Sequence, residues 1–337
     1  MKNILVTGGA GFIGSNFIRH IYHKYPEYNI INLDKLTYAG NCINLTDISQ
    51  SNRYTFVKGD ICDPKLADDL MQCAHMVVNF AAESHVDRSI IGAGEFVHTN
   101  AHGVYNLLNA ARTHKVERFL QVSTDEVYGS LDTDEPAWTE DSPLAPRNPY
   151  SVTKASGDMM AQAFHVTYGF PVVITRASNN IGPFQYPEKR IPLFITNAID
   201  DIPLPIYGLG EAIRDHLFVT DHCEAIDLVL HKGETGQAYN VGADNEADGL
   251  EVAQHILTLL DKPHDLINFV DDRPGHDLRY ALNISKIRAL GWDPLFNFET
   301  ALAKTVSWYL KYQNWWRNIR SSDDFSNYYN KQYKTCA

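Results

Sequence analysis

Short apolar runs and longer segments with helical spacing alternate along the first half of the chain. Apolar residues recur at helical steps in residues 12–21 and again in residues 95–114. The short runs, each of a length typical of a buried strand, are residues 2–7, 29–33, 54–57, 76–80 and 118–123. Strands that alternate with helices predict an α/β fold with a parallel, doubly wound sheet. In such a sheet ligands bind beyond the carboxyl ends of the strands.

The pattern changes beyond about residue 176, where short segments rich in Pro, Gly and Asn follow one another. We expect a helix at residues 221–230 and a strand at residues 237–241, both returning to the first sheet. Residues 249–260 and 298–312 have the spacing of amphipathic helices. The sequence therefore predicts two interleaved domains and a tail without a readable motif. The larger is residues 1–177 plus about 216–242, the smaller C-terminal domain is about 178–215 plus 243–315, and the tail is 316–337.

Composition narrows the class of protein. The chain has 337 residues, 44% apolar and 21% charged, as in ordinary globular proteins, and no apolar run is long enough to span a bilayer. The net charge of −12 argues against binding to nucleic acid or to an anionic membrane. Cys42, Cys62, Cys73, Cys223 and Cys336 lack metal-ligand spacing, so we expect no metal site. Without a signal peptide at the start, a cytoplasmic location is expected.

The first apolar run ends in a glycine motif. Gly8, Gly11 and Gly14 have the spacing G-x-x-G-x-x-G between the strand and the first helix, where backbone N–H groups bind a pyrophosphate. The second run ends in Asp34, which would accept the ribose hydroxyls of NAD and repel the extra phosphate of NADP. Asp60 follows the third run, where we expect it to form one edge of the site for the adenine. A glycine triplet alone is also compatible with a purely structural turn, but together these features predict a Rossmann-like, NAD-binding domain.

Tyr150 and Lys154 lie four residues apart behind a helix start at Asn148-Pro149, so both are expected on one helix face. A phenol with a pKa of about 10 is a poor base at neutral pH. The Lys154 ammonium and a cationic nicotinamide favour the phenolate and lower that pKa. Tyr150 is then able to take a proton from a sugar hydroxyl as its carbon gives up a hydride. A Tyr and a Lys at this spacing also occur on ordinary helix surfaces.

Thr124, Asp125 and Glu126 follow the fifth run and are aimed at the same sheet edge. If a sugar is oxidised at C4, its C5 proton becomes acidic. Glu126 is then a candidate to remove that proton, and a protonated Asp125 to give one to the leaving C6 hydroxyl. Spacing alone does not assign these two roles, and a solvated loop would also carry adjacent carboxylates. The combination predicts elimination of water across an oxidised intermediate.

Several short motifs follow one another along the chain in the same order as in one known family. They are Thr7-Gly-Gly-Ala-Gly-Phe-Ile-Gly14, Asp34-Lys-Leu-Thr-Tyr-Ala-Gly40, Ala82-Glu-Ser-His-Val-Asp-Arg-Ser89, Thr124-Asp-Glu-Val-Tyr-Gly129, Tyr150-Ser-Val-Thr-Lys154, Ser178-Asn-Asn-Ile-Gly-Pro183 and Asp272-Arg-Pro-Gly-His276. From residue 1 to about 312 the chain resembles the nucleotide-sugar 4,6-dehydratases of the extended short-chain dehydrogenase/reductase family, most closely the branch that acts on dTDP-glucose.

The resemblance implies a hydro-lyase with retained NAD. Asp125 would be the acid and Glu126 the base, with Thr124 holding the C4 hydroxyl beside Tyr150. Hydride would pass from C4 to NAD⁺, water would leave across C5–C6, and the hydride would return to C6. The product would be a 4-keto-6-deoxy sugar nucleotide for deoxysugar biosynthesis. UDP-, GDP- or CDP-linked sugars remain alternative substrates.

The resemblance also implies the binding residues. For the cofactor they are Gly8, Gly11, Phe12, Ile13, Gly14, Asp34, Lys35, Thr37, Gly40, Asp60, Ile61, Ala81, Ala82, Ser84, Thr99, Ser123, Tyr150, Lys154 and Ser178. For the nucleotide sugar, held by the smaller domain, they are Ser84, His85, Thr124, Asn179, Glu188, Lys189, Arg190, Leu193, Pro205, Tyr207, Arg214, Asn240, Arg273 and His276. Arginine forks suit a diphosphate, and the motif positions favour Arg214 and Arg273 over Arg190.

At two places the chain departs from the family pattern, and both bear on which nucleotide or sugar is accepted. His216 stands where the family usually has Trp, and residues 245–249 differ from the segment expected beside the base. A sugar-nucleotide 4-epimerase or decarboxylase would share Tyr150, Lys154 and NAD but would not need Asp125 and Glu126. A non-catalytic NAD-binding protein of this fold would be expected to lack one of those four residues.

A homodimer is also implied, packed through residues 95–114 and the helix that carries Tyr150. Its candidate apolar residues, which core packing explains equally well, are Val104, Leu107, Leu108, Met159, Met160 and Phe164.

Overall fold

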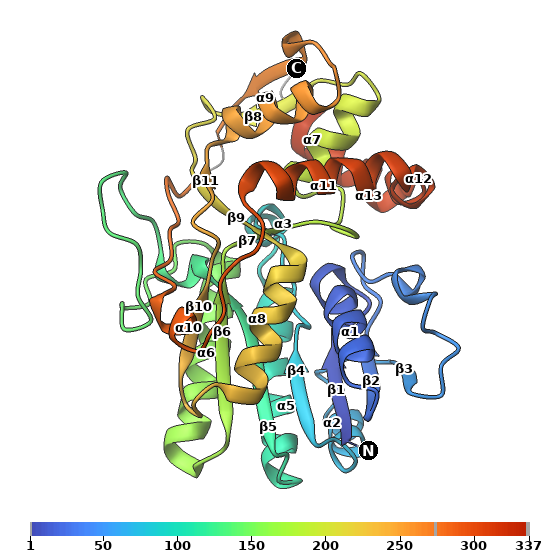
Figure 1. The fold of residues 1–337 in the computed structure, drawn as a ribbon, viewed down its shortest axis with the longest axis vertical. Coiled ribbons are helices and arrows are strands. Elements are labelled where there is room, and N and C mark those ends of the chain that lie inside the picture. The colour runs from blue at the N-terminus through green and yellow to red at the C-terminus, as the bar shows by residue number, and fades with distance from the viewer. Residues whose placement is uncertain (1, 273–274, 335–337) are drawn as a thin grey trace.

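A computed structural model describes residues 2–272 and 275–334 of the chain. The larger part is a seven-stranded sheet in the order β10-β6-β5-β4-β1-β2-β3, in which every pairing is parallel (Figure 1). The chain order jumps from β4 to β1 at the middle of this sheet, the switch point where doubly wound folds bind ligands. The Rossmann-like fold expected from the sequence is confirmed.

The strands of the large sheet are β1 (Lys2–Thr7), β2 (Tyr28–Asp34), β3 (Tyr54–Lys58), β4 (Met76–Asn79), β5 (Arg118–Thr124), β6 (Val172–Ala177) and β10 (Ala238–Val241). Its helices are α1 (Phe12–Lys24), α2 (Pro64–Met71), α3 (Val86–Ile91), α4 (Gly94–Val97), α5 (Val104–Thr113), α6 (Pro149–Tyr168), α8 (Val219–Lys232) and α10 (Ser285–Ala289). Short helical turns are η1 (Cys42–Leu45), η2 (His98–Gly103) and η3 (Asp125–Tyr128).

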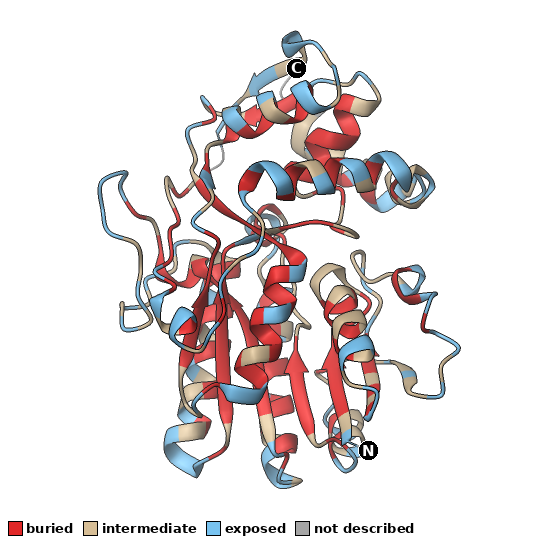
Figure 2. Cartoon of the chain, viewed as in Figure 1, coloured by how far each residue is buried: buried red, intermediate tan, exposed pale blue. Residues whose placement is uncertain are grey.

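Alternate residues of each central strand enter two different cores. Ile4 and Val6 of β1 pack with α1 and α8 on one face of the sheet, whereas Leu5 packs with α2, α5 and α6 on the other. Side chains of a strand alternate between faces, so a strand covered on both sides reads as a continuous apolar run. Figure 2 shows these strands as buried along most of their length.

The smaller part lies beyond the carboxyl ends of the strands (Figure 1). It contains β7 (Asn179–Ile181), α7 (Arg190–Ile199), β8 (Leu204–Tyr207), β9 (Arg214–Phe218), β11 (Glu246–Ala247), α9 (Gly249–Leu259), η4 (His264–Leu266), β12 (Ile267–Val270), α11 (Phe298–Lys311), α12 (Gln313–Arg320), α13 (Asp323–Tyr329) and η5 (Asn330–Lys334). Its strands form the sheets β11-β9-β7 and β12-β8.

A third core, built by α7, α9 and α11, fills this part. We propose from this separate core a two-domain division close to the one given by the sequence, with the difference that α10 packs against β10 of the large sheet and not in the smaller part. The helix at 221–230 and the strand at 237–241 return to the large sheet as expected, because β10 pairs with β6. No helix of the described residues combines the length and the apolar character needed to cross a membrane.

Candidate active site

Two adjoining pockets lie at the carboxyl ends of the strands. The first follows the ends of β1, β2, β4 and β5, and the second lies between this edge and the smaller part. Glu126 and Asn179 line both pockets. The site is therefore continuous from the glycine motif to the smaller domain.

The glycine motif forms a tight turn between β1 and α1. Gly8 has φ +68°, and a Cβ there would come within 2.7 Å of the Ala81 backbone N. A Cβ on Gly14 would come within 2.3 Å of the Gly8 carbonyl oxygen. Only glycine fits at these two positions. Gly11 caps α1 without a side-chain hydrogen bond, so the helix N-terminus is suited to a phosphate.

Asp34 ends β2 and is buried beside this turn. Its Oδ2 accepts a hydrogen bond from the Ala10 N–H at 2.9 Å, and its Oδ1 accepts one from the Leu36 N–H at 2.8 Å. Burial raises the pKa of the carboxyl, and the two N–H groups oppose that shift. The side chain is thus fixed in orientation at the edge of the first pocket.

The structure brings together every residue predicted to bind the cofactor. All of them, from Gly8 to Ser178, line the first pocket. The catalytic residues Thr124, Asp125, Glu126, Tyr150 and Lys154 line it as well. The sequence did not single out His222, which lies in the same wall. His222 comes from α8, far in the sequence from the glycine motif.

Thr124, Asp125 and Glu126 form the turn in which β5 passes into η3. The Thr124 hydroxyl accepts a hydrogen bond from the Glu126 N–H at 3.3 Å and donates one to Asp125 Oδ1 at 3.0 Å. The Asn148 amide caps α6 by accepting from the Ser151 N–H, and its Nδ2 lies 3.4 Å from Glu126 Oε2. One turn and one helix cap therefore hold the two carboxyl groups side by side.

Asp125 differs from Glu126 in its surroundings. It is 2% exposed, and its Oδ2 has no hydrogen-bond partner among the described residues. Burial, and then the neighbouring Glu126 carboxylate, raise the pKa of Asp125 to about 8. The carboxyl is therefore protonated at neutral pH and able to donate a proton, as an acid kept neutral by its environment does.

Tyr150 and Lys154 lie on one face of α6, and both are buried. The Lys154 ammonium donates to the Val122 carbonyl at 2.7 Å, and burial lowers its pKa to about 8. Burial, Glu126 and Asp125 raise the pKa of Tyr150 well above its ordinary value, and a hydrogen bond with the Thr124 side chain opposes this shift. The lowering of this pKa by Lys154 together with a cationic nicotinamide stays a prediction, because the protein groups that shift the pKa here are burial and the two carboxyl groups, which raise it.

The second pocket contains most of the residues predicted to bind the nucleotide sugar. These are His85, Asn179, Glu188, Lys189, Arg190, Leu193, Pro205, Tyr207, Arg214 and His276. Ser84 and Thr124 line the first pocket instead. Arg273 lies outside the described residues. Tyr333, from the tail that had no readable motif, also lines the second pocket.

Arg190 and Arg214 supply positive charge to this pocket. Arg214 donates to the carbonyls of Ile213 and Asp277, and its guanidinium lies 4.2 Å from the centre of the Tyr280 ring. Arg190 Nη2 lies 3.2 Å from His216 Nε2. Burial, and then the Arg190 charge, lower the pKa of His216 to about 3, so this imidazole is neutral and able to accept a hydrogen bond from Arg190.

Asn240 is a correction to the predicted site. It lies in β10, fully buried, and does not line either pocket. Its Oδ1 accepts from the Tyr128 hydroxyl at 2.7 Å, and its Nδ2 donates to the Trp138 carbonyl at 2.9 Å. Both ends of the amide make hydrogen bonds that join β10 to η3 and to the loop that follows it. We therefore assign Asn240 a structural role.

The tail closes one side of the second pocket. The Tyr333 ring is tilted against the Tyr207 ring with ring centres 6.1 Å apart, and Tyr328 donates to Asp87 at 3.2 Å. Asp324 forms an ion pair with Arg88 at 2.8 Å. In the sequence, only the dense aromatic content of residues 315–333 indicates that this segment packs against the rest of the protein.

A dinucleotide fits the first pocket. Gly8 and Gly14, which pack tightly against backbone atoms of Ala81 and of the turn itself, hold this turn and the start of α1 in the pocket wall. His222 Nδ1 lies 2.8 Å from Asn180 Oδ1, while its buried Nε2 has no partner among the described residues. Burial lowers the pKa of His222 to about 3, so Nε2 is a neutral acceptor. A bound ligand with an N–H or O–H group would complete it.

Comparison with known proteins adds a further finding. The family model described as GDP-mannose 4,6 dehydratase matches residues 5–305. The dTDP-glucose 4,6-dehydratase of Streptomyces niveus is 49% identical over 326 residues, which cover 95% of this chain and 96% of the relative.

Two solved structures are also similar. The crystal structure of DesIV, a dTDP-glucose 4,6-dehydratase from Streptomyces venezuelae with NAD and TYD bound, has a TM-score of 0.92 and 46% identity, covering 94% of this chain and 99% of that one. That of dTDP-glucose 4,6-dehydratase from Bacillus anthracis in complex with NAD has a TM-score of 0.89 and 48% identity, covering 95% of this chain and 100% of that one.

Proposed function

The chain belongs to the family of nucleotide-sugar 4,6-dehydratases, and on that premise we propose that it converts dTDP-glucose to dTDP-4-keto-6-deoxyglucose for deoxysugar biosynthesis. The protein is an NAD-dependent enzyme, a hydro-lyase. The observation that carries the reaction type is the pairing of a buried Asp125, whose pKa is raised to about 8 by burial and by its neighbour, with Glu126 in the wall of the cofactor pocket. A 4-epimerase or decarboxylase has no use for such a pair.

Tyr150 is the proposed base for the C4 hydroxyl. Its phenol lies in hydrogen-bonding reach of the Thr124 hydroxyl, which would hold the same sugar hydroxyl. When bound, NAD supplies oxidation at C4 and returns the hydride to C6. Lys154 contributes positive charge behind Tyr150 and is fixed by the Val122 carbonyl.

Glu126 and Asp125 are the proposed pair for the loss of water. Glu126 removes the C5 proton once C4 is a ketone, because the resulting carbanion is stabilised as an enolate. Asp125 donates its proton to the leaving C6 hydroxyl. The raised pKa of Asp125 supports this assignment, since a carboxyl that is neutral at pH 7 is an acid and not a base.

The second pocket is the proposed site of the nucleoside diphosphate. Arg190, Arg214 and Lys189 bring positive charge to its wall in a chain whose net charge is −12. Guanidinium forks bind diphosphates well. Tyr207 and Tyr333 offer aromatic faces for the base. His85, Glu188 and His276 complete the lining nearer the sugar and the tail.

Mass spectrometry of dTDP-glucose incubated with the purified enzyme, without added NAD, tests the reaction. We expect loss of one water and NAD retained in the protein. Glu126→Gln should oxidise the sugar without exchanging its C5 proton, and Tyr150→Phe should fail to oxidise it. An epimer, or loss of carbon dioxide, would contradict the proposal. If only UDP-, GDP- or CDP-glucose reacts, the reaction stands and the choice of base is wrong.

We also propose a homodimer built on α6 and the helical segment from α4 to α5. Val152, Met159 and Val166 are exposed at seven-residue steps along α6, and Val97 and Tyr105 are exposed on the neighbouring segment. Such a stripe of exposed apolar residues is typical of a helix interface. Val104, Leu107, Leu108 and Phe164, which the sequence had offered for this role, are core residues instead, and Met160 packs against the same core.

A cytoplasmic location completes the proposal. Cys42, Cys62, Cys73 and Cys223 are all free, and two of them are exposed. Exposed free thiols are compatible with a reducing compartment. Fractionation of the native host cells, with the enzyme followed by antibody, would test this location.

A further inference from the structure

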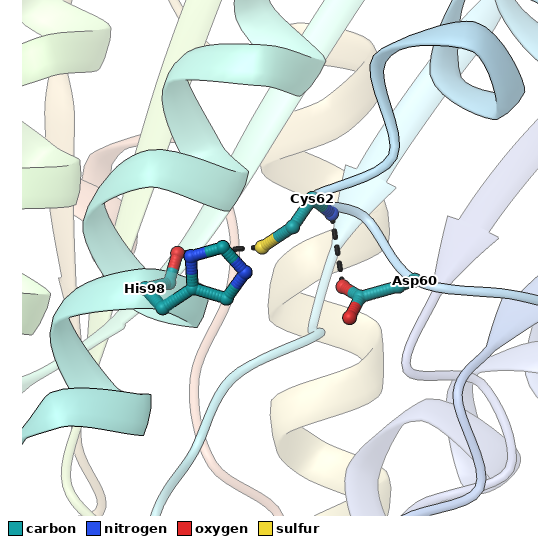
Figure 3. Close-up of side chains that lie close together, drawn as sticks. All are labelled: Asp60, Cys62 and His98. Atoms are coloured by element: carbon teal, nitrogen blue, oxygen red, sulfur yellow. Dashed lines mark hydrogen bonds between the residues drawn. The ribbon is translucent and has the colours of Figure 1, made fainter.

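Three side chains with different metal-binding atoms meet at the adenosine end of the first pocket. Asp60 and Cys62 follow β3, and His98 begins η2, so the three come from two distant segments (Figure 3). A carboxylate oxygen of Asp60, the Cys62 sulfur and a ring nitrogen of His98 all lie within 4.8 Å of one another. The spacing of the cysteines had predicted no metal site, because His98 lies 36 residues from Cys62.

Local hydrogen bonds hold this arrangement in place. Asp60 Oδ1 accepts from the Cys62 N–H at 2.9 Å, which folds the segment so that both side chains point the same way. The Cys62 sulfur lies 3.3 Å from the His98 carbonyl oxygen, which ties the segment to η2. Asp60 and Cys62 are half-buried and His98 is exposed. A cation therefore has access from solvent while two of the three ligands are already positioned.

We propose that Asp60, Cys62 and His98 bind a thiophilic divalent cation, of which Zn²⁺ is the biological representative, and that this binding opposes that of NAD. One sulfur, one imidazole nitrogen and one carboxylate oxygen are a ligand set that zinc accepts, with the fourth position left to water. The thiol proton leaves as the sulfur–metal bond forms.

Opposition to NAD follows from shared residues and rests on the proposed cofactor site. Asp60 lines the cofactor pocket, and so does Thr99, the residue after His98. Lys35, another residue of this pocket, forms an ion pair with Asp60 at 2.8 Å. A cation bound by Asp60 would displace Lys35 and occupy the edge proposed for the adenine. If the metal and NAD weaken each other's binding, the factor by which the metal lowers the affinity for NAD must equal the factor by which NAD lowers the affinity for the metal.

Co²⁺ is the probe for this site, because a cobalt–thiolate bond gives a charge-transfer absorption in the near ultraviolet. We expect one Co²⁺ per chain with this band, displaced by Zn²⁺, once the retained NAD has been removed from the purified enzyme, and weaker binding to the enzyme that still holds NAD. Cys62→Ser should abolish the band, and His98→Gln should weaken binding at least about tenfold. Lys35→Gln should tighten binding, because it removes the competing ammonium.

His102→Gln is the matched control. His102 lies one turn further on, is exposed, and stacks on His98 with ring centres 5.5 Å apart, yet it is not part of the cluster. Its loss should leave Co²⁺ binding unchanged. Equal weakening by His98→Gln and His102→Gln would overturn the site in favour of ordinary surface histidines, and so would a band that survives Cys62→Ser.

Added NAD tests the coupling separately. Saturating NADH, which binds at the same site, should weaken Co²⁺ binding by the same factor by which Co²⁺ weakens NADH binding, as read by the fluorescence of this reduced cofactor. If the affinity for Co²⁺ is the same with and without the dinucleotide, the proposed antagonism between metal and cofactor is wrong. Because the cobalt band needs no turnover, a failure of the proposed dehydration would leave this result unchanged, and the two hypotheses fail separately.

Discussion

Two adjacent carboxyl groups acquire different chemistry from their surroundings. Asp125 points into the protein and is buried, whereas Glu126 is partly exposed and lies beside the Asn148 amide. Moving a carboxylate out of water disfavours its charge, and a second carboxylate nearby adds to that effect. The sequence supplies the pair, but only the fold decides which member keeps its proton.

Loss of the Asp125 proton should therefore limit the reaction at high pH. Its pKa is raised to about 8 by burial and by Glu126, so kcat should be steady around neutral pH and fall as pH rises through about 8. Asp125→Asn cannot donate this proton and should lower kcat about 10²- to 10⁴-fold. A pH profile of kcat measures both effects. If the wild-type fall at high pH persists unchanged in Asp125→Asn, a different group causes it.

His216 should tune the affinity for the nucleotide sugar through Arg190. The neutral imidazole accepts a hydrogen bond from the Arg190 guanidinium at 3.2 Å inside the second pocket. His216→Phe removes that acceptor and should raise KM about tenfold with little change in kcat, since a hydrogen bond to a charged group contributes roughly 1.5–3 kcal/mol. His216→Gln retains an acceptor and should recover much of the affinity. A fall in kcat at constant KM would contradict this role.

Residue roles were predictable where short-range geometry fixes them. The glycine motif, Asp34 and the pair Tyr150 and Lys154 depend on one turn, one strand end and one helix face, and all lie where expected. Asn240 was expected in the nucleotide-sugar site, because nothing in its own segment shows that its amide makes hydrogen bonds with Tyr128 and Trp138 instead. Contacts between residues so distant in sequence leave no local pattern.

At the scale of elements, α1 and α8 are joined by a buried carboxylate. Asp227 of α8 is 1% exposed and accepts from Lys24 Nζ at 2.6 Å, from the Tyr25 hydroxyl at 3.0 Å and from His20 Nε2 at 2.9 Å. His231 Nδ1 lies 2.8 Å from Oδ1 of Asp227, the oxygen that also accepts from Tyr25. Despite burial, these partners hold the pKa of Asp227 well below its ordinary value.

Asp227→Asn should destabilise the enzyme and remove part of its pH dependence. The carboxylate stabilises the fold above its ordinary pKa, and this contribution is lost as pH falls through the acid range. Asp227 also raises the pKa of His231, so that second contribution is complete below about pH 6.5 and lost as pH rises further. Because Lys24 is half exposed, we expect a loss of about 2–3 kcal/mol near pH 6 rather than the full value for a buried pair.

Urea unfolding of wild type and variant across this pH range measures the effect. Asp69→Asn is the control, because the one ion pair of Asp69 within the described part of the chain is with the exposed Lys65 on the surface of α2. It should leave the unfolding midpoint unchanged. A stability difference between wild type and Asp227→Asn that is the same at every pH would contradict the linkage.

Elements with a regular apolar pattern were found from the sequence, and irregular ones were not. The long helix expected at 95–114 is broken by the π-helical segment η2, in which Asn100 donates to the Glu83 carbonyl and to Thr153. A π segment adds one residue to a turn and leaves the apolar spacing almost intact. The helices α12 and α13 were missed because their apolar residues are few, although Trp316 enters a core made mostly by distant segments and Phe325 is buried.

At the scale of the whole molecule, the large sheet is covered on both faces, yet one helical layer still exposes apolar side chains. Val152 is 49%, Met159 60% and Val166 82% exposed along a single stripe of α6. The neighbouring Tyr105 packs its ring near Phe164 while remaining 43% exposed. The same helix carries Tyr150 and Lys154 on its buried side, so whatever covers the stripe also supports the catalytic helix.

A charge placed on this stripe should separate the proposed dimer. Met159→Lys, alone or with Val166→Lys, puts an ammonium where two copies of α6 would pack, and an unpaired buried charge is strongly unfavourable. Light scattering after size exclusion should give the dimer mass, 76 kDa for two chains of 38.0 kDa, for wild type and the monomer mass for the double variant. Leu295→Lys, at a residue 76% exposed on a different surface, should remain dimeric. Because α6 positions Tyr150, the monomer should also show a lower kcat while still binding nucleotide sugar. A double variant that remains dimeric would place the interface elsewhere, and a wild type of monomer mass would rule the dimer out.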